Sequence, residues 1–290
     1  MVSAPEFPMQ SPDETELRSL LNGVDIPACP EVLLQLDREL RKDNANQREI
    51  ARLISRDVAL SGHVMQVVNS PMFSTGREIT SIMQALTILG TKQVFDLVVV
   101  ELLRTAMSGS ADVSLDRFWD NSARTARLSS EIAKRLRCVA PDMAYTFGLF
   151  HDCGMPLLMK RFANYKDVLV EANGDDERGF TEVEEKHLGT NHAVVGYFLA
   201  RRWKLPDFLA KGILHHHDYL LLLDDTALPP DARAVIAVNA FSEHISRLHA
   251  GDFNDAEWVK AASPVSTALR LTEDTVDDLV EDLRDWIEGN

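Results

Sequence analysis

Apolar residues recur at helical spacing along nearly the whole chain, and this pattern limits the folds open to it more than any other feature. The spacing is clearest in two groups of residues: Ile50, Leu53 and Ile54, and then Ile82, Ala85, Leu86 and Leu89. A period of about 3.6 residues is typical of helices that bury one face. No window alternates apolar and polar residues as a half-buried strand does. We therefore predict an all-α fold.

A short polar stretch, Ser108-Gly109-Ser110, separates two main helical regions. We expect an N-terminal helical subdomain over residues 24–110, after an N-terminal extension over residues 1–23, and a second helical subdomain over residues 111–250. Residues 251–290 form an acidic C-terminal segment in which apolar residues share one helical face: Val276, Leu279, Val280, Leu283, Trp286 and Ile287. This stripe predicts an outer helix that packs by its apolar face, and a partner-binding tail is the alternative.

The chain has 45 acidic and 30 basic residues, which gives a formal net charge of −15. This balance argues against a general affinity for nucleic acid, whose phosphates require a basic surface. The three cysteines form no CxxC pair, which is typical of proteins in a reducing compartment. The N-terminus lacks the apolar core of a signal peptide. The longest apolar stretch, residues 95–103, is far shorter than the roughly 20 residues that cross a bilayer. We therefore expect a cytoplasmic protein that does not enter membranes.

Eight of the nine histidines lie between residues 151 and 249, so histidine chemistry is expected in the second helical region. The first of them, His151, precedes Asp152 inside an apolar run. Burying a polar group without a partner costs roughly 2–7 kcal/mol, and more for a charge. A metal ion would satisfy both side chains. The alternative is structural, with His151 bonded to a carbonyl and Asp152 capping the next helix.

A predicted helical hairpin brings more histidines to one level. His192 begins a helix that ends at Trp203, and the next helix runs to three consecutive histidines at positions 215–217. His192 lies 11 residues before Trp203, and His216 lies 10 residues after Pro206. With a rise of about 1.5 Å per residue, antiparallel helices place these two histidines at the same end of the hairpin.

Together these residues predict a metal site with His151, Asp152, His192, His216 and His217 as ligands. Imidazole and carboxylate ligands suit a divalent transition metal such as Fe, Mn or Zn. The alternative is that His192 is an exposed residue of a first helical turn. The three consecutive histidines would then be a polar helix end, where the helix dipole favours protonated histidine.

With these motifs the chain resembles HDOD proteins, a divergent branch of the HD phosphohydrolase superfamily that is related to the HD-GYP proteins. The matching motifs follow the family's order over roughly residues 24–250. They are Ile26-Pro27, Pro30-Glu31-Val32, Leu53-Ile54-Ser55-Arg56-Asp57 with Leu60, Val68-Asn69-Ser70-Pro71 with Phe73, Ser81-Ile82, Ala85, Leu89-Gly90, Phe118-Trp119, His151-Asp152-Cys153-Gly154, His192 with Gly196, Trp203 with Leu205-Pro206, and His216-His217. The resemblance implies a multi-helix, HD-like bundle with an N-terminal helical subdomain.

Two positions depart from the pattern of the catalytic HD enzymes. The resemblance implies a metal-binding histidine shortly after Phe118-Trp119, where this chain has Asn121, and an aspartate on a late helix, where Asn239 stands. A neutral amide holds a divalent cation less firmly than a carboxylate or an imidazole does. Hydrolysis in this superfamily depends on a metal-activated water. The resemblance therefore implies a degenerate site with a metal that is weakly bound or absent.

We expect a standalone regulatory module of signal transduction that binds a protein partner or a small signal. The resemblance implies this role, since HDOD domains are common in bacterial signalling proteins. The alternative is a metal-dependent phosphohydrolase or phosphodiesterase that acts on a nucleotide, such as a cyclic dinucleotide or an alarmone. Nucleic-acid binding is a third hypothesis, which the acidic composition disfavours.

Overall fold

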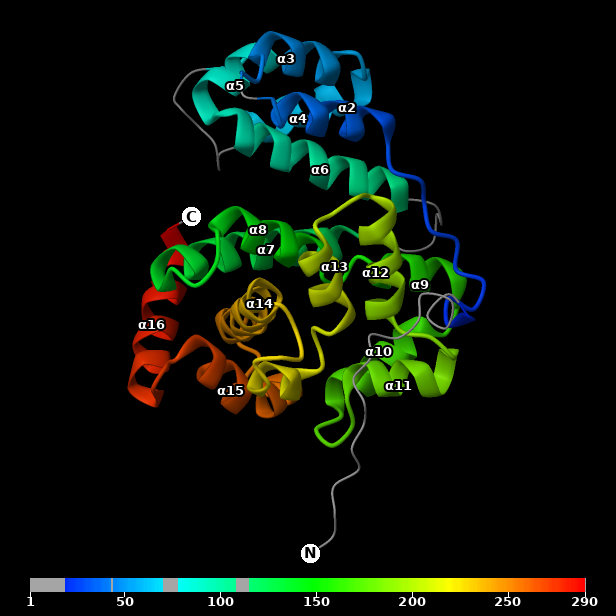
Figure 1. Ribbon diagram of the computed structural model, residues 1–290, viewed down its shortest axis with the longest axis vertical. Coiled ribbons are helices and arrows are strands. Elements are labelled where there is room, and N and C mark those ends of the chain that lie inside the picture. The colour runs from blue at the N-terminus through cyan, green and yellow to red at the C-terminus, as the bar shows by residue number, and fades with distance from the viewer. Residues whose placement is uncertain (1–18, 43, 70–77, 108–114, 290) are drawn as a thin grey trace, which may run out of the picture. The chain divides into compact units, whose positions relative to one another are not determined.

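A computed structural model describes residues 19–42, 44–69, 78–107 and 115–289 (Figure 1). These residues form α-helices and one short 3-10 helix, and they contain no strand. The prediction of an all-α fold is therefore confirmed. Several residues named in the sequence predictions lie outside the described ranges: residues 1–18 of the extension, Ser108-Gly109-Ser110, and the motif residues Ser70, Pro71 and Phe73.

The chain divides into two compact units. One comprises Pro27–Ala123 with Trp286–Asn290, and the other comprises Met1–Ile26 with Arg124–Asp285. The boundary between them falls inside helix α7 (Asp116–Leu136). The four-part division drawn from the sequence, with its main boundary at residue 110, stays a prediction.

The unit around residues 27–123 is built from short helices. They are α2 (Glu31–Leu40), α3 (Gln47–Ser55), α4 (Val58–Val68), α5 (Ile82–Leu89), α6 (Thr91–Met107) and the first part of α7. Asn46, Asp57 and Ser81 begin three of these helices, because each side chain accepts a hydrogen bond from a backbone N–H of the first turn. After α4, the Asn69 side chain exchanges two hydrogen bonds with the backbone of Ile79, at 2.8 and 2.9 Å. Asn69 thus has a structural role.

The other unit contains the rest of α7 and the helices that follow it. They are α8 (Pro141–Phe150), α9 (Met155–Arg161), α10 (Tyr165–Gly174), α11 (Phe180–Leu188), α12 (His192–Arg202), α13 (Asp207–Leu214), the 3-10 helix η2 (Tyr219–Leu223), α14 (Pro230–His249), α15 (Ala256–Leu269) and α16 (Glu273–Gly289). Figure 1 shows α14 end-on, with α8, α13 and α15 around it. Its buried residues include Val235, Ile236, Val238 and Phe241, which point in several directions. A helix buried on most sides forms the centre of its unit.

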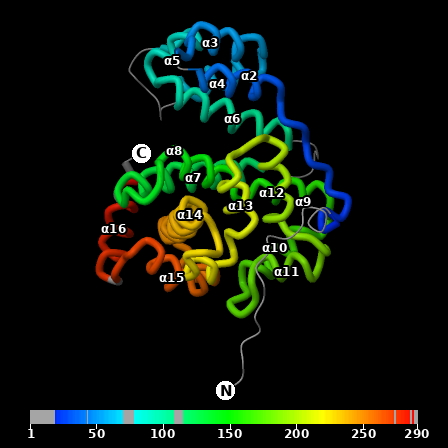
Figure 2. The backbone as a smooth tube through the Cα atoms, in the orientation of Figure 1, coloured from blue at the N-terminus to red at the C-terminus, as the bar shows by residue number. Residues whose placement is uncertain are grey.

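Helices α12 and α13 lie side by side, as the predicted hairpin requires (Figure 2). Two glycines permit close packing here. A Cβ atom at Gly154 would lie 2.1 Å from the carbonyl oxygen of His192, and one at Gly196 would lie 2.9 Å from Cγ2 of Ile213. Because a side chain at either position would collide, glycine lets the turn between α8 and α9 approach α12, and α12 approach α13. This packing brings Asp152 against the histidines of the hairpin.

The C-terminal helix α16 lies on the outside of its unit. Its acidic residues Asp277, Asp278 and Glu281 are exposed, whereas Leu283 from the apolar stripe is buried. Asp282 also pairs with Arg135 of α7 at 3.2 Å. The helix therefore packs by its apolar stripe, as the pattern predicts. None of the described helices is both long and apolar enough to cross a membrane.

Candidate metal centre

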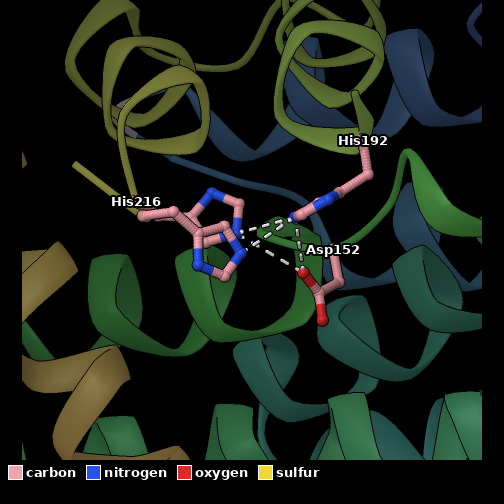
Figure 3. Close-up of side chains that lie close together, drawn as sticks. Asp152, His192 and His216 are labelled. Atoms are coloured by element: carbon pink, nitrogen blue, oxygen red, sulfur yellow. Dashed lines mark hydrogen bonds and ion pairs between the residues drawn. The ribbon is translucent and has the colours of Figure 1, made fainter. Parts of the chain in front are cut away.

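Four side chains from three separate parts of the sequence converge at one point; Figure 3 labels Asp152, His192 and His216. Asp152 lies in the turn after α8, His192 is the first residue of α12, and His216 and His217 follow α13. Each offers a donor atom, and these atoms all lie within 4.8 Å of one another. We call these four residues the imidazole cluster.

The donor atoms of the cluster nearly touch. Nε2 of His192 lies 3.0 Å from Nε2 of His216 and 3.2 Å from Nε2 of His217. Oδ1 of Asp152 lies 3.3 Å from Nε2 of His192 and 3.4 Å from Nε2 of His216. The hairpin argument therefore placed His192 correctly at the same end as His216 and His217, whereas His215 pairs with Asp218 instead.

Local structure fixes where each histidine stands. Asn191 caps α12 by accepting a hydrogen bond from the N–H of Val194, which sets His192 in the first helical turn. In the second helix of the hairpin, α13 ends at Leu214, and the chain turns through His216 and His217 before η2 begins. The N-terminal end of α12 and the C-terminal end of α13 therefore bring their imidazoles to the same place.

The second ring nitrogen of each histidine is held by an oxygen. Nδ1 of His192 lies 2.7 Å from Oε2 of Glu184, Nδ1 of His216 lies 2.7 Å from the carbonyl oxygen of Ile213, and Nδ1 of His217 lies 2.8 Å from Oε2 of Glu257. Carbonyl and carboxylate oxygens only accept hydrogen bonds, so each Nδ1 carries a proton. In the neutral imidazole the lone pair is then on Nε2. With all three histidines neutral, three such lone pairs would point at one another, so the cluster needs a shared cation or a proton on Nε2 of His192.

The distances and the donor types both fit a metal ion. Imidazole nitrogen and carboxylate oxygen bind Zn²⁺ at about 2.0–2.2 Å, so neighbouring ligands of a tetrahedral site lie roughly 3.3 Å apart. The four donor–donor distances given above are 3.0–3.4 Å, and all the donor atoms lie within 4.8 Å of one another. Imidazole with carboxylate suits Zn, Fe and Mn. The imidazole cluster could therefore hold a divalent first-row metal.

The charges around the cluster attract a cation. Burial favours the neutral form of His192, but the carboxylates of Glu184 and Asp152 outweigh it and raise the pKa of His192 to about 10. Burial lowers the pKa of His216 to about 3, helped by His217 beside it. Burial alone would raise the pKa of Asp152, yet His151, together with His192 and His216 beside it, holds it well below its usual range. The centre thus favours positive charge between its carboxylates.

Two tyrosines complete the surroundings of the histidines. Tyr165 donates its hydroxyl to Glu184, and burial together with Glu184 raises the pKa of Tyr165 well above its usual value. Tyr219 donates its hydroxyl to Oε2 of Glu257 at 3.1 Å. Two Tyr–Glu–His chains therefore lead to His192 and His217. Outer partners of this kind fix the orientation of a metal-binding histidine and raise its basicity.

Sequence reasoning missed these glutamates and tyrosines. One signal was available for Glu184, which stands on the buried face of α11 with Phe180, Val183 and Leu188. A carboxylate on the apolar face of an amphipathic helix requires a buried partner. Glu257 gives no such signal, because its contact with His217 depends on how α15 packs against η2.

His151 lies next to the cluster but is held differently. Its Nδ1 is 2.9 Å from the carbonyl oxygen of Gly148, and its Nε2 is 3.2 Å from Oδ2 of Asp152 and 3.1 Å from Oε1 of Glu243. Both ring nitrogens face oxygens. Burial lowers the pKa of His151, but Asp152 and Glu243 outweigh it and raise the pKa well above its usual value. His151, Asp152 and Glu243 form a second group that could hold a metal, which we call the His151 cluster.

The two asparagines at the expected ligand positions lie in different surroundings. Asn239 is buried on α14, donates from Nδ2 to Oε2 of Glu243 at 3.2 Å, and leaves Oδ1 without a hydrogen-bond partner. It therefore borders the His151 cluster. Asn121 is exposed, on the part of α7 that belongs to the other compact unit. Their roles as replaced ligands stay predictions.

Comparison with known proteins supports both the fold and the family resemblance. The HDOD domain model matches residues 26–219, which is well over half of the chain. A solved structure of an HDOD domain protein with unknown function from Geobacter sulfurreducens is 27% identical. It has a TM-score of 0.70, over 95% of this chain and 94% of that one.

Two further proteins extend the comparison. A solved structure from Shewanella amazonensis has a TM-score of 0.69 and 23% identity, over 92% of this chain and 93% of that one, which shows a shared fold. An uncharacterized protein from Treponema pallidum is 25% identical over 234 residues, or 79% of this chain. The chain spans 43% of the length of that curated relative.

Proposed function

Because this chain belongs to the HDOD domain family, we propose that it is a regulatory module of a signalling system. In this proposal the imidazole cluster binds one divalent metal ion as part of the folded structure. The module acts through a protein partner or a small signal and does not turn over a substrate.

The observation that carries the proposal is the closed donor set of the imidazole cluster. Four protein side chains supply the donors, and His192 and His216 are buried. Structural zinc sites are closed by four protein ligands, whereas catalytic sites keep a position open for water or substrate. A closed, buried site favours a structural or sensing role for the metal.

The carboxylates around the histidines also support a role other than phosphate hydrolysis. Asp152 and the glutamates at 184, 243 and 257 all contact histidines of the two clusters. An anionic substrate that approached the metal would meet this negative charge, and like charges oppose binding. The arrangement suits a cation and not a phosphate ester.

A bound ion would supply cross-linking free energy. It would tie the turn after α8, the start of α12 and the segment between α13 and η2, which are distant in sequence. Metal binding to such a site adds to the stability of the folded state. Occupancy would therefore rigidify this region, which gives a regulatory module a way to respond to metal.

One observation favours a second candidate, a two-metal phosphohydrolase acting on a nucleotide. Asp152 presents Oδ1 to the imidazole cluster and Oδ2 to the His151 cluster. A carboxylate shared in this way is compatible with two-metal hydrolysis.

The test compares the wild type with Asp152→Ala after loading with Zn, Fe or Mn. Both proteins are assayed with p-nitrophenyl phosphate, bis-p-nitrophenyl phosphate and a cyclic dinucleotide. We expect metal in the wild type and no hydrolysis that depends on Asp152. Hydrolysis by the loaded wild type that disappears in Asp152→Ala would overturn the proposal in favour of the phosphohydrolase.

A further inference from the structure

The 3-10 helix η2 exposes two leucines on a firmly anchored segment. Tyr219 and Leu222 of η2 are buried, whereas Leu220 is 77% exposed and Leu223 is 52% exposed. Residues three apart eclipse each other in a 3-10 helix, so the two exposed leucines lie along one edge. We call Leu220 and Leu223 the leucine face. Exposed apolar residues that lie together with a polar rim are candidates for an interaction surface.

The 3-10 helix that carries the leucine face is connected to the imidazole cluster through Glu257. Tyr219 donates its hydroxyl to Oε2 of Glu257 at 3.1 Å, and Nδ1 of His217 lies 2.8 Å from the same oxygen. Helix α15, which carries Glu257, packs against η2. One carboxylate oxygen thus joins a residue of η2 to a candidate metal ligand. A change in the position of His217 would therefore reach η2 by two routes. One is the backbone, because Tyr219 follows His217 by two residues, and the other is the Glu257 oxygen that both side chains contact.

Acidic residues flank the leucine face at both ends. Asp218 precedes η2, and Asp224 and Asp225 follow it. Asp218 pairs with His215 at 2.8 Å and Asp225 pairs with Arg233, yet both carboxylates are largely exposed. Arg233 is the one arginine in these pairs, so the three aspartates leave the edge of the leucine face negative.

This charge determines which occupant fits. In a symmetric contact with a second copy, the acidic edges would face each other, and the chain as a whole carries −15. Like charges so placed oppose association. An amphipathic helix with apolar residues at helical spacing would cover the leucines, and lysines or arginines beside them would meet the aspartates.

We propose that the leucine face docks a basic amphipathic helix of a protein partner. We further propose that metal in the imidazole cluster sets how η2 presents this face. The second statement rests on the proposed function, whereas the first stands on the leucine face and its charges alone.

The experiment uses the full chain and a synthetic peptide of about 14 residues. Leucines recur in it at helical spacing (i, i+3, i+4, i+7), and lysines occupy the opposite face. A peptide of equal charge with serine in place of leucine reports the purely electrostatic part. The double variant Leu220→Ser with Leu223→Ser removes the leucine face. Val170→Ser on α10 is the matched control, because Val170 is also 75% exposed.

We expect the double variant to bind the leucine–lysine peptide about tenfold more weakly than the wild type, and Val170→Ser to bind like the wild type. Equal affinity for all three proteins would overturn the docking proposal. Sedimentation of the wild type gives the other contrary outcome, since self-association that the double variant loses would identify a second copy as the occupant.

The metal arm repeats the titration with loaded and chelator-treated wild type, after elemental analysis has established the metal content. We expect the peptide affinity to change by about threefold or more on loading, and hydrogen exchange in residues 215–223 to slow. Unchanged affinity and exchange with metal bound would overturn the coupling and leave the docking proposal standing. Failure to bind metal at all would instead overturn the proposed function, and the leucine variants would still decide the docking.

Discussion

The two oxygens of the Asp152 carboxylate face two groups of side chains that use histidine differently. On the Oδ1 side, His192 and His216 present Nε2 at 3.3 and 3.4 Å, and each Nδ1 is held by an oxygen further out. On the Oδ2 side, His151 faces Asp152 and Glu243 through Nε2 and the carbonyl of Gly148 through Nδ1.

Nδ1 faces an oxygen in both groups, so the difference lies in the neighbours of Nε2, which include other imidazole nitrogens on the Oδ1 side and only carboxylates on the Oδ2 side. In the imidazole cluster an oxygen holds Nδ1 of each histidine, and Nε2 of His192 points at Nε2 of His216 and His217. A cation bound to these Nε2 atoms would satisfy them together. In the His151 cluster all the neighbours of both nitrogens accept hydrogen bonds, so His151 serves as a donor between carboxylates. We infer that the metal binds in the imidazole cluster, on the Oδ1 side of Asp152, and that His151 bonds to the carboxylates on the Oδ2 side. The predictions below run from the largest expected effect on metal binding to the smallest.

Asp152→Ala should have the largest effect, because it removes a donor and the only carboxylate among the four cluster residues. We expect metal affinity to fall by on the order of a thousandfold, measured by competition with a chromogenic chelator. Circular dichroism of the variant controls for folding. A folded variant that retains the wild-type affinity would show that the metal binds elsewhere.

Glu184→Gln should weaken metal binding by about 10- to 100-fold, since it removes the charge that holds Nδ1 of His192. The matched variant is Glu257→Gln, which makes the same change behind His217. Glu184 is fully buried and Glu257 only partly, so the effect should be larger for Glu184. The same chelator competition measures both, and a larger loss in Glu257→Gln would reverse this order.

Asn239→Asp should add a second, weaker metal equivalent. The substitution places a carboxylate where a buried amide oxygen has no hydrogen-bond partner, beside Glu243 and His151. A carboxylate binds divalent cations better than an amide does. Elemental analysis after loading with excess Mn gives the stoichiometry. An unchanged stoichiometry would mean that the lack of charge on Asn239 is not the reason why the His151 cluster binds no metal.

His151→Ala should leave the metal content unchanged and act on stability alone. It removes the donor that lies between Asp152 and Glu243, and breaking a buried ion pair costs about 3 kcal/mol. Urea unfolding of the loaded protein measures this loss, with elemental analysis of the same sample. Complete loss of metal from a folded His151→Ala protein would make His151 a ligand after all.

Much of the fold and part of the site could be predicted from the sequence, because both depend on local patterns. Helical periodicity predicted the all-α class, and counting residues from the hairpin turn brought His192 level with His216. Adjacency placed Asp152 beside His151. Each of these inferences needs only the rise and period of a helix.

The rest depends on tertiary packing that no local pattern encodes. Glu257 reaches His217 across 40 residues of sequence, and Glu243 reaches His151 across 92. The sequence predicted His151 as a ligand together with the four residues of the imidazole cluster; the structure places it in a separate group with Asp152 and Glu243, and its role as a ligand stays a prediction. That distinction appears only when the turn after α8 packs on α12.

Metal stoichiometry of the tag-free wild-type protein tests the central claim most directly. The protein is incubated in turn with excess Zn, Fe and Mn, desalted, and analysed for metal per chain. One equivalent, lost in His192→Ala and retained in His151→Ala, is the predicted result. Two equivalents per chain, or none with any of the three ions, would contradict the assignment of one cation to the Oδ1 side of Asp152.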